Sequence, residues 1–126
     1  MPKIVPDRPG LEPGDYPFSK VVEANGFVFV AGQVGEAPGG HGAVPGGIEA
    51  ETRAMLDNVG RLLHAVDLDY GDVVRCTVYL RDFGDFAAMN AVYREYFPSQ
   101  PPARATVGVT ALAADFSIEI EVTAAR

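Results

Sequence analysis

The sequence predicts an α+β fold in which one mixed β-sheet carries two helices on one of its faces. Segments rich in β-branched and aromatic residues, typical of strands, occur at residues 18–33 and again at residues 104–123. Two segments with helical hydrophobic spacing lie between them. A strand-like segment also separates the two helical segments, so the expected order is β-β-α-β-α-β-β. The chain has 126 residues, the length of one domain, and we expect residues 1–126 to form a single domain.

The first two strands are expected to form a hairpin. Residues 18–24 and 27–33 are rich in β-branched and aromatic side chains, and Asn25-Gly26 stands between them. Asn-Gly favours a type I′ turn because both central residues of that turn need a positive φ angle. Residues 34–47, which hold six glycines and two prolines, are expected to form a loop.

Two helices are predicted from apolar residues that recur at helical spacing. The first begins near Ile48 and ends near Asp67, and the second covers about residues 85–96, where Pro98 stops it. Residues 73–80, between the helices, have the composition of a strand. The same holds for residues 104–109 and 116–123, which we expect to be antiparallel neighbours.

Alternation along these last two strands divides their side chains between the two faces of the sheet. Val107 and the isoleucines of the final strand are expected beneath the helices. Arg104 and Thr106 would then share the opposite, polar face with Glu119 and Glu121. This assignment predicts that Arg104 lies close to Glu119.

Two explanations of this polar face stay open. A face wetted by solvent is common in antiparallel sheets. A face covered by a second copy of the chain is favoured by Val22, Phe27 and Phe29, which give the hairpin more apolar surface than one helical layer needs. In such an interface Arg104 could bind a planar carboxylate through two parallel hydrogen bonds. Glu119 would either form a structural ion pair with Arg104 or orient a water molecule.

The composition disfavours several classes of function. The formal net charge of -7, from 17 acidic residues against 10 Lys and Arg, disfavours nucleic acid and anionic membranes as partners. Neither a secretory signal nor an apolar run of the roughly 18 residues needed to span a membrane is visible, so we expect a cytoplasmic protein. The single cysteine, Cys76, fits a reducing compartment. His41 and His64 have no further ligands at suitable spacing, so no metal site is expected.

Several short motifs occur together in a fixed order. The most specific are Pro-Ala-Arg at 102–104, which enters a strand, and Ile-Glu-Ile-Glu at 118–121. They are accompanied by Pro-Phe-Ser-Lys at 17–20, Phe-Val-Ala-Gly-Gln at 29–33 and Asp-Phe-Ala-Ala-Met-Asn at 85–90. From about residue 14 to its end, the sequence resembles the RidA (YjgF-type) reactive intermediate imine deaminase family, also described as endoribonuclease L-PSP.

The resemblance implies a chorismate-mutase-like fold assembled as a homotrimer, with clefts at the subunit interfaces. Catalytic members of the family hydrolyse imines and enamines to 2-oxo acids and ammonia, and they use no metal or organic cofactor. By this resemblance Arg104 would bind the substrate carboxylate, and Glu119 would position the attacking water. The further substrate-binding positions would be Phe18, Ala31, Gly32, Asn90 and Thr106.

Three positions depart from the pattern of the best-known deaminases of the family. Phe18 replaces a cleft tyrosine, Ala31 replaces a serine, and Thr106 replaces a cysteine. Each change removes or alters a polar group, which favours a bulkier or more apolar imine than 2-aminoacrylate. The alternative to an imine deaminase is a noncatalytic trimer that binds small carboxylates and has a regulatory role. A ribonuclease is disfavoured by the acidic balance of charge.

Overall fold

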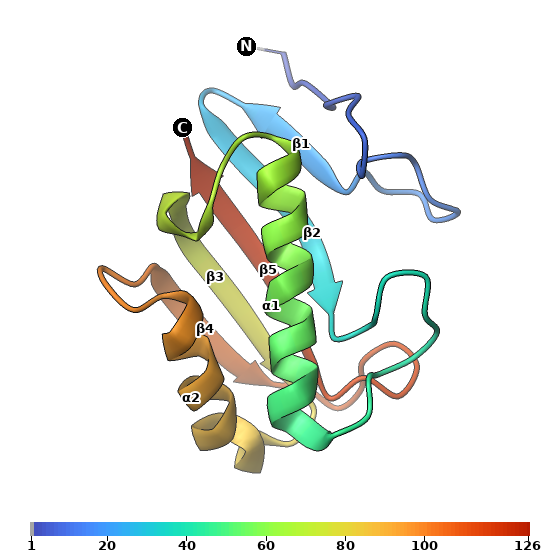
Figure 1. The fold of residues 1–126 in the computed structure, drawn as a ribbon, viewed down its shortest axis with the longest axis vertical. Helices are drawn as coiled ribbons and strands as arrows, with labels where there is room; N and C mark the ends of the chain where they lie inside the picture. Colours follow the sequence, from blue (N-terminus) through green and yellow to red (C-terminus); the bar gives the residue numbers. More distant parts are fainter. Residues whose placement is uncertain (1) are drawn as a thin grey trace.

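The computed structural model describes residues 2–126, which form one five-stranded sheet with two α-helices on one of its faces (Figure 1). The strands are β1 (Val21–Ala24), β2 (Phe27–Val34), β3 (Val73–Leu80), β4 (Ala103–Gly108) and β5 (Ile118–Ala125). The helices are α1 (Gly47–Ala65) and α2 (Phe86–Tyr96), and the 3-10 turns η1 (Tyr70–Asp72) and η2 (Phe83–Asp85) precede β3 and α2. The predicted order of elements and the placement of both helices on one face are confirmed.

The hairpin of β1 and β2 has the predicted turn. Asn25 and Gly26 have φ angles of 53° and 81°, as a type I′ turn requires. The first strand is shorter than expected because the chain bends at residues 15–18, where the Phe18 amide donates to the Tyr16 carbonyl at 2.8 Å. Phe18 therefore lies in the segment that leads into the sheet and not in a strand.

The sheet has the strand order β1-β2-β5-β3-β4, so β5 is central and β4 is an edge strand. The prediction that the last two strands are antiparallel neighbours is wrong. β5 pairs antiparallel with β2 and β3, whereas β4 pairs in parallel with β3. The reason is the connection between β3 and β4, which runs through α2. A helical crossover carries the chain back to the start of the sheet, so the second strand runs parallel to the first.

The assignment of the β4 side chains to the two faces is also wrong. Arg104 lies opposite Cys76 in the register of β3 and β4, and Cys76 is fully buried beneath the helices. Arg104 and Thr106 are therefore on the helix-covered face, whereas Val107 is 40% exposed on the open face. Glu119 lies opposite Tyr79 on the open face. The prediction failed because it assumed that the apolar side chains of β4 pack under the helices.

The core fills the space between the helices and the covered face of the sheet. Its fully buried members include Met55, Leu56, Leu63, Met89 and Ile120. Neither helix combines the length and the apolar character that a membrane crossing would need, as judged over residues 2–126.

Candidate functional site

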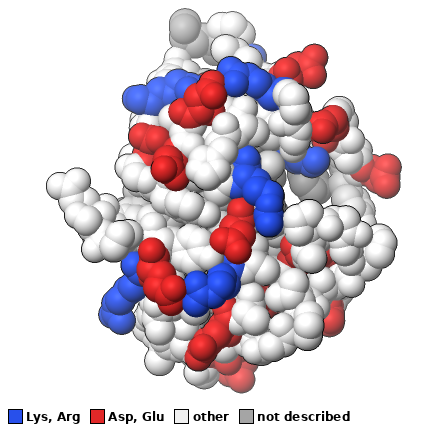
Figure 2. Space-filling model, in the orientation of Figure 1, with Lys and Arg blue, Asp and Glu red and all other residues white. Residues whose placement is uncertain are grey.

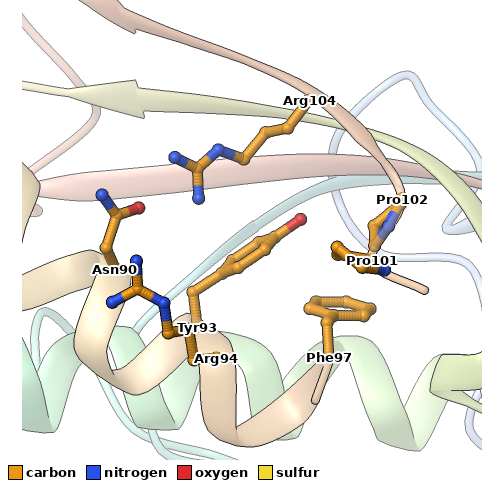
Figure 3. Close-up of a pocket in the computed structure, with 7 residues that line it drawn as sticks. All are labelled: Asn90, Tyr93, Arg94, Phe97, Pro101, Pro102 and Arg104. Atoms are coloured by element: carbon orange, nitrogen blue, oxygen red, sulfur yellow. The ribbon is translucent and has the colours of Figure 1, made fainter. Parts of the chain in front are cut away.

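One group of candidate residues lies between β4 and α2, in a pocket of about 280 Å³ that we call the arginine pocket (Figure 3). Arg104 enters it from β4, and Asn90, Tyr93 and Arg94 enter it from α2. The remaining lining residues are Phe97, Pro101 and Pro102, at the turn between the two elements. The resemblance had named Arg104 and Asn90, and the structure brings these two together.

The Arg104 guanidinium is held by aromatic rings. Its central carbon lies 4.6 Å from the centroid of the Tyr93 ring and 5.7 Å from that of Phe86. Its Nη1 also donates to the sulfur of Met89 at 3.9 Å. Within residues 2–126, no carboxylate oxygen lies within 4.0 Å of this guanidinium. The rings therefore pack against the group, and its N–H donors other than the one directed at Met89 remain available for an anion.

Two groups next to Arg104 have raised pKa values: Tyr93, which lines the arginine pocket, and Cys76, which is buried opposite Arg104 on β3. Burial is the main cause that raises the pKa of Tyr93 and also that of Cys76. Both groups are therefore neutral near pH 7, and Cys76 is a buried thiol with no nucleophilic character. Thr106, also on this face, has a buried hydroxyl with no hydrogen-bond partner in the described part of the chain.

The second group of candidate residues lies around Glu119, in a wider cleft of about 970 Å³ that we call the glutamate cleft. Its lining includes three further residues named by the resemblance, which are Phe18, Ala31 and Gly32. The pairing of β2 with β5 shifts register between Val30 and Gln33, next to this cleft. Such a bulge bends the strand, which here occurs at Ala31 and Gly32.

Glu119 packs directly against Gly32. A Cβ atom added to Gly32 would lie 3.1 Å from the carboxyl carbon of Glu119 and closer still to its Oε2, so only a glycine leaves room for this carboxylate. Burial raises the pKa of Glu119 above its ordinary range, and the negative charge of Glu121 adds to this effect. A carboxylate with a raised pKa is a stronger general base than an exposed one.

The loop between β2 and α1 forms one wall of the glutamate cleft and is anchored by side chains. The Glu36 carboxylate accepts from the amide of Gly42 at 2.9 Å, and the Asp115 carboxylate accepts from the amide of Ala43 at 3.0 Å. Asn58 on α1 donates to the Glu36 carbonyl at 2.8 Å. The loop is therefore tied both to α1 and to the segment that precedes β5.

The arginine pocket and the glutamate cleft share no lining residue. Arg104 lies on the covered face at the edge of the sheet, and Glu119 lies on the open face, with β3 between their strands. The prediction that the two side chains are close is therefore wrong within one chain. The pKa of Glu119 is accordingly raised by burial and by Glu121, and not set by an arginine.

Several residues of the two sites were missed by reasoning from the sequence. Tyr16 stacks on Phe18 with ring centroids 6.1 Å apart and planes 5° apart, so it brings a phenol to the glutamate cleft. His41 of the loop lines the same cleft. Arg94 lines the arginine pocket, and its position four residues after Asn90 was a signal, because such residues share one face of a helix.

The surface charges are mixed on the helix-bearing side of the molecule. Figure 2 shows Lys and Arg interspersed with Asp and Glu there, without a continuous basic area. Over residues 2–126, His, Cys, Asp and Glu side chains form no group of three or more that could hold a metal ion.

Comparisons with known proteins show the family to which this chain belongs. The family model described as endoribonuclease L-PSP matches residues 12–126. A RutC family protein from Pyrococcus horikoshii is 44% identical over 105 residues, which cover 83% of this chain and 83% of the relative. A 2-iminobutanoate/2-iminopropanoate deaminase from Capra hircus is 40% identical over 110 residues, which cover 87% of this chain and 80% of the relative.

The fold is likewise shared with solved structures of the family. The structure of TdcF from E. coli with bound serine matches with a TM-score of 0.84 and 31% identity, covering 92% of this chain and 97% of that chain. The chain therefore belongs to the endoribonuclease L-PSP family, which includes the RidA and YjgF proteins that its motifs resemble.

Proposed function

We propose that this protein hydrolyses reactive imines and enamines of amino acids to 2-oxo acids and ammonia. The observation that carries the proposal is the pair of complementary sites: an arginine with no counterion among residues 2–126 in one, and a carboxylate of raised pKa in the other. The name of the 2-iminobutanoate/2-iminopropanoate deaminase, at 40% identity, supports the same activity for this chain.

Catalysis would take place between copies of the chain, assembled as a homotrimer. Because Arg104 and Glu119 lie on opposite faces, a second copy would have to bring its glutamate cleft to the arginine pocket of the first. Apolar side chains on the open face support such an assembly: Phe27 and Phe29 are each 45% exposed, and Val107 is 40% exposed. Exposed apolar residues that gather on one face are typical of an interface.

The reaction would proceed by addition of water and loss of ammonia. Arg104 binds the substrate carboxylate through two parallel hydrogen bonds, and Asn90 donates to or accepts from the same substrate. Glu119 of a neighbouring copy accepts a proton from water as the water oxygen bonds to the imine carbon, and it passes this proton to the imine nitrogen, which gives a carbinolamine. Glu119 then takes the hydroxyl proton of the carbinolamine and delivers it to the nitrogen as the carbon–nitrogen bond breaks, so that the products are ammonia and a 2-oxo acid.

The second candidate function is a noncatalytic trimer that binds small carboxylates. Phe18, Ala31 and Thr106 support it, because these positions lack the tyrosine hydroxyl, the serine hydroxyl and the thiol of the best-known deaminases. Tyr16 weighs against it, because its stacking on Phe18 brings a hydroxyl group to the same cleft.

The Arg104→Ala variant tests the proposal. An amino-acid oxidase generates imines from several amino acids while semicarbazide traps them, and the wild-type protein is expected to suppress trapping. Loss of a charge-assisted anchor should lower kcat/KM by about 10- to 150-fold, since such hydrogen bonds contribute about 1.5–3 kcal/mol. Arg61→Gln, which changes an exposed arginine outside both sites, is the control. If wild type suppresses the trapping of none of the imines, the deaminase function is refuted, and the binding of small carboxylates becomes the better-supported function.

Glu121 offers a test of the role of Glu119. Because its negative charge raises the pKa of Glu119, Glu121→Gln should lower that pKa. The base would then remain ionised at lower pH, so the acid limb of the pH profile of kcat/KM should move to lower pH. Glu95→Gln, which removes an equal charge from the helix layer, should leave that limb in place. An acid limb that does not move in Glu121→Gln would exclude Glu119 as the titrating group.

A further inference from the structure

The arginine pocket contains a second guanidinium to which no role has been assigned so far. Arg94 projects from α2 into the pocket that Arg104 enters from β4. Figure 3 shows the Arg104 guanidinium, the Asn90 amide and the Arg94 guanidinium gathered at one end of the pocket, with Phe97, Pro101 and Pro102 toward the other end.

Neither guanidinium has a counterion in the described part of the chain. The ion pairs of residues 2–126 join Arg8 to Asp67, Arg53 to Glu95, His64 to Asp69 and Arg126 to Glu23. No carboxylate is among the lining residues of the arginine pocket. What distinguishes Arg94 and Arg104 is that both line the same pocket.

Two neighbouring cations repel each other unless anionic groups lie between them. The Arg104 guanidinium lies over the Tyr93 ring, with its central carbon 4.6 Å from the ring centroid, and this contact favours its present position. A single carboxylate would satisfy Arg104 and leave Arg94 unpaired. A ligand with two carboxylates would satisfy both, and the Asn90 amide can bond to either oxygen or nitrogen of such a ligand.

From this arrangement we infer that the preferred substrates are imines with a second carboxylate, formed from acidic amino acids. Arg104 binds the carboxylate next to the imine carbon, and Arg94 binds the one at the end of the side chain. The inference rests on the proposed function and specifies its substrate class. It differs from the bulkier, more apolar imine that Phe18, Ala31 and Thr106 favour on sequence grounds.

The hydrolysis is the one described above, with no added co-reactant. Water adds to the carbon–nitrogen double bond, the carbinolamine collapses, and the products are ammonia and a 2-oxo dicarboxylic acid. Both carboxylates keep their charge throughout. Arg94 therefore contributes to binding, and its effect should appear in KM more than in kcat.

Calorimetric binding of two matched probes tests the assignment of Arg94. 2-Oxoglutarate and 2-oxopentanoate have equal chain length and differ only in the terminal carboxylate. Wild type should bind 2-oxoglutarate roughly five- to tenfold more tightly than 2-oxopentanoate. This ratio lies between those expected for exposed and for sheltered ion pairs, because Arg94 is exposed but lines a pocket. In Arg94→Gln the ratio of the two affinities should fall toward one, whereas Arg104→Gln should weaken the binding of both probes. Arg61→Gln should leave the ratio unchanged.

Kinetics with imines generated from glutamate and norvaline provide the second readout. Arg94→Gln should raise KM for the glutamate imine more than for the norvaline imine. An affinity ratio near one in wild type, or a ratio that Arg94→Gln leaves unchanged, would overturn the dicarboxylate inference even if both imines are hydrolysed. If neither imine is hydrolysed although imines of other amino acids are, the dicarboxylate substrate class is refuted and the deaminase stands. If no imine is hydrolysed, the deaminase is refuted as well, while the calorimetric ratio still decides whether Arg94 binds a second carboxylate.

Discussion

Mixing two impaired variants, Arg104→Ala and Glu119→Gln, is expected to raise activity well above that of either variant alone. If every catalytic cleft takes Arg104 from one copy and Glu119 from the next, some clefts of a mixed trimer contain both intact residues. Equal amounts refolded together should give about a quarter of the wild-type rate, because each cleft has an even chance of an intact residue from either side. The expected effect is large, since loss of a general base alone costs about 10²–10⁴-fold.

The control for this experiment is a mixture of Arg104→Ala with the double variant that carries both changes. That mixture contains no intact Arg104, so its rate should not rise above that of Arg104→Ala alone after the same refolding. Native mass spectrometry establishes that the copies have exchanged. A freely exchanged mixture of the single variants that stays as inactive as its components would show that catalysis does not combine Arg104 and Glu119 from different copies.

Gly32→Ala is expected to lower kcat/KM by about 10²-fold while leaving the fold intact, since a displacement of about 1 Å in a catalytic group can cost that much. The added Cβ would overlap Oε2 of Glu119 and lie 3.1 Å from its carboxyl carbon, so the carboxylate must move. Gly32 is not among the glycines with positive φ, so alanine fits its backbone conformation. The loss should therefore come from the position of Glu119 and not from unfolding.

Gly14→Ala is the matched control, because a Cβ at Gly14 would have no heavy atom within 4 Å. Steady-state kinetics and the thermal unfolding midpoint should be measured for both variants. A Gly32→Ala protein with wild-type kcat/KM would mean that the observed position of the Glu119 carboxylate is not the catalytic one. A large fall in the unfolding midpoint would instead assign the loss to folding.

The local features of the fold could be predicted from the sequence, because short-range interactions determine them. Asn25-Gly26 requires two positive φ angles in succession, and the structure has them. The strand expected at residues 73–80 has the bounds Val73–Leu80, and both helices begin and end within two residues of the prediction. The spacing of apolar residues predicts the helices, Asn-Gly predicts the hairpin turn, and a proline predicts the end of the second helix; each signal lies within a short stretch of sequence.

The arrangement of the sheet depends on contacts that the order of residues does not reveal. The neighbour of β4 is decided by the α2 crossover, and the resulting register puts Arg104 opposite the buried Cys76. The rule that apolar residues face the core failed for β4 because the aromatic rings of α2 cover the arginine there. Alternation predicts which residues share a face, but the packing partners decide which face is covered.

The candidate residues came from family resemblance, and their grouping came from the structure. Arg104 with Asn90, and Glu119 with Gly32, could be named because their motifs are specific. That these pairs line two separate sites could not be predicted, since it follows from the order β5-β3-β4 and the face on which each side chain lies. Arg94 has no motif of its own, and only its spacing from Asn90 pointed to it.

The placement of Arg104 and Glu119 on opposite faces also affects how this protein could diversify. Residues on the exposed side of α2 can change which ligand is held without disturbing the tight contact between Gly32 and Glu119. Substitutions at Arg94 and at neighbouring solvent-facing positions are therefore tolerated by the core, since they remove no buried atoms. Under the proposed function, a single surface mutation would give this scaffold a new preference for its ligand while Glu119 kept its proposed role in activating water.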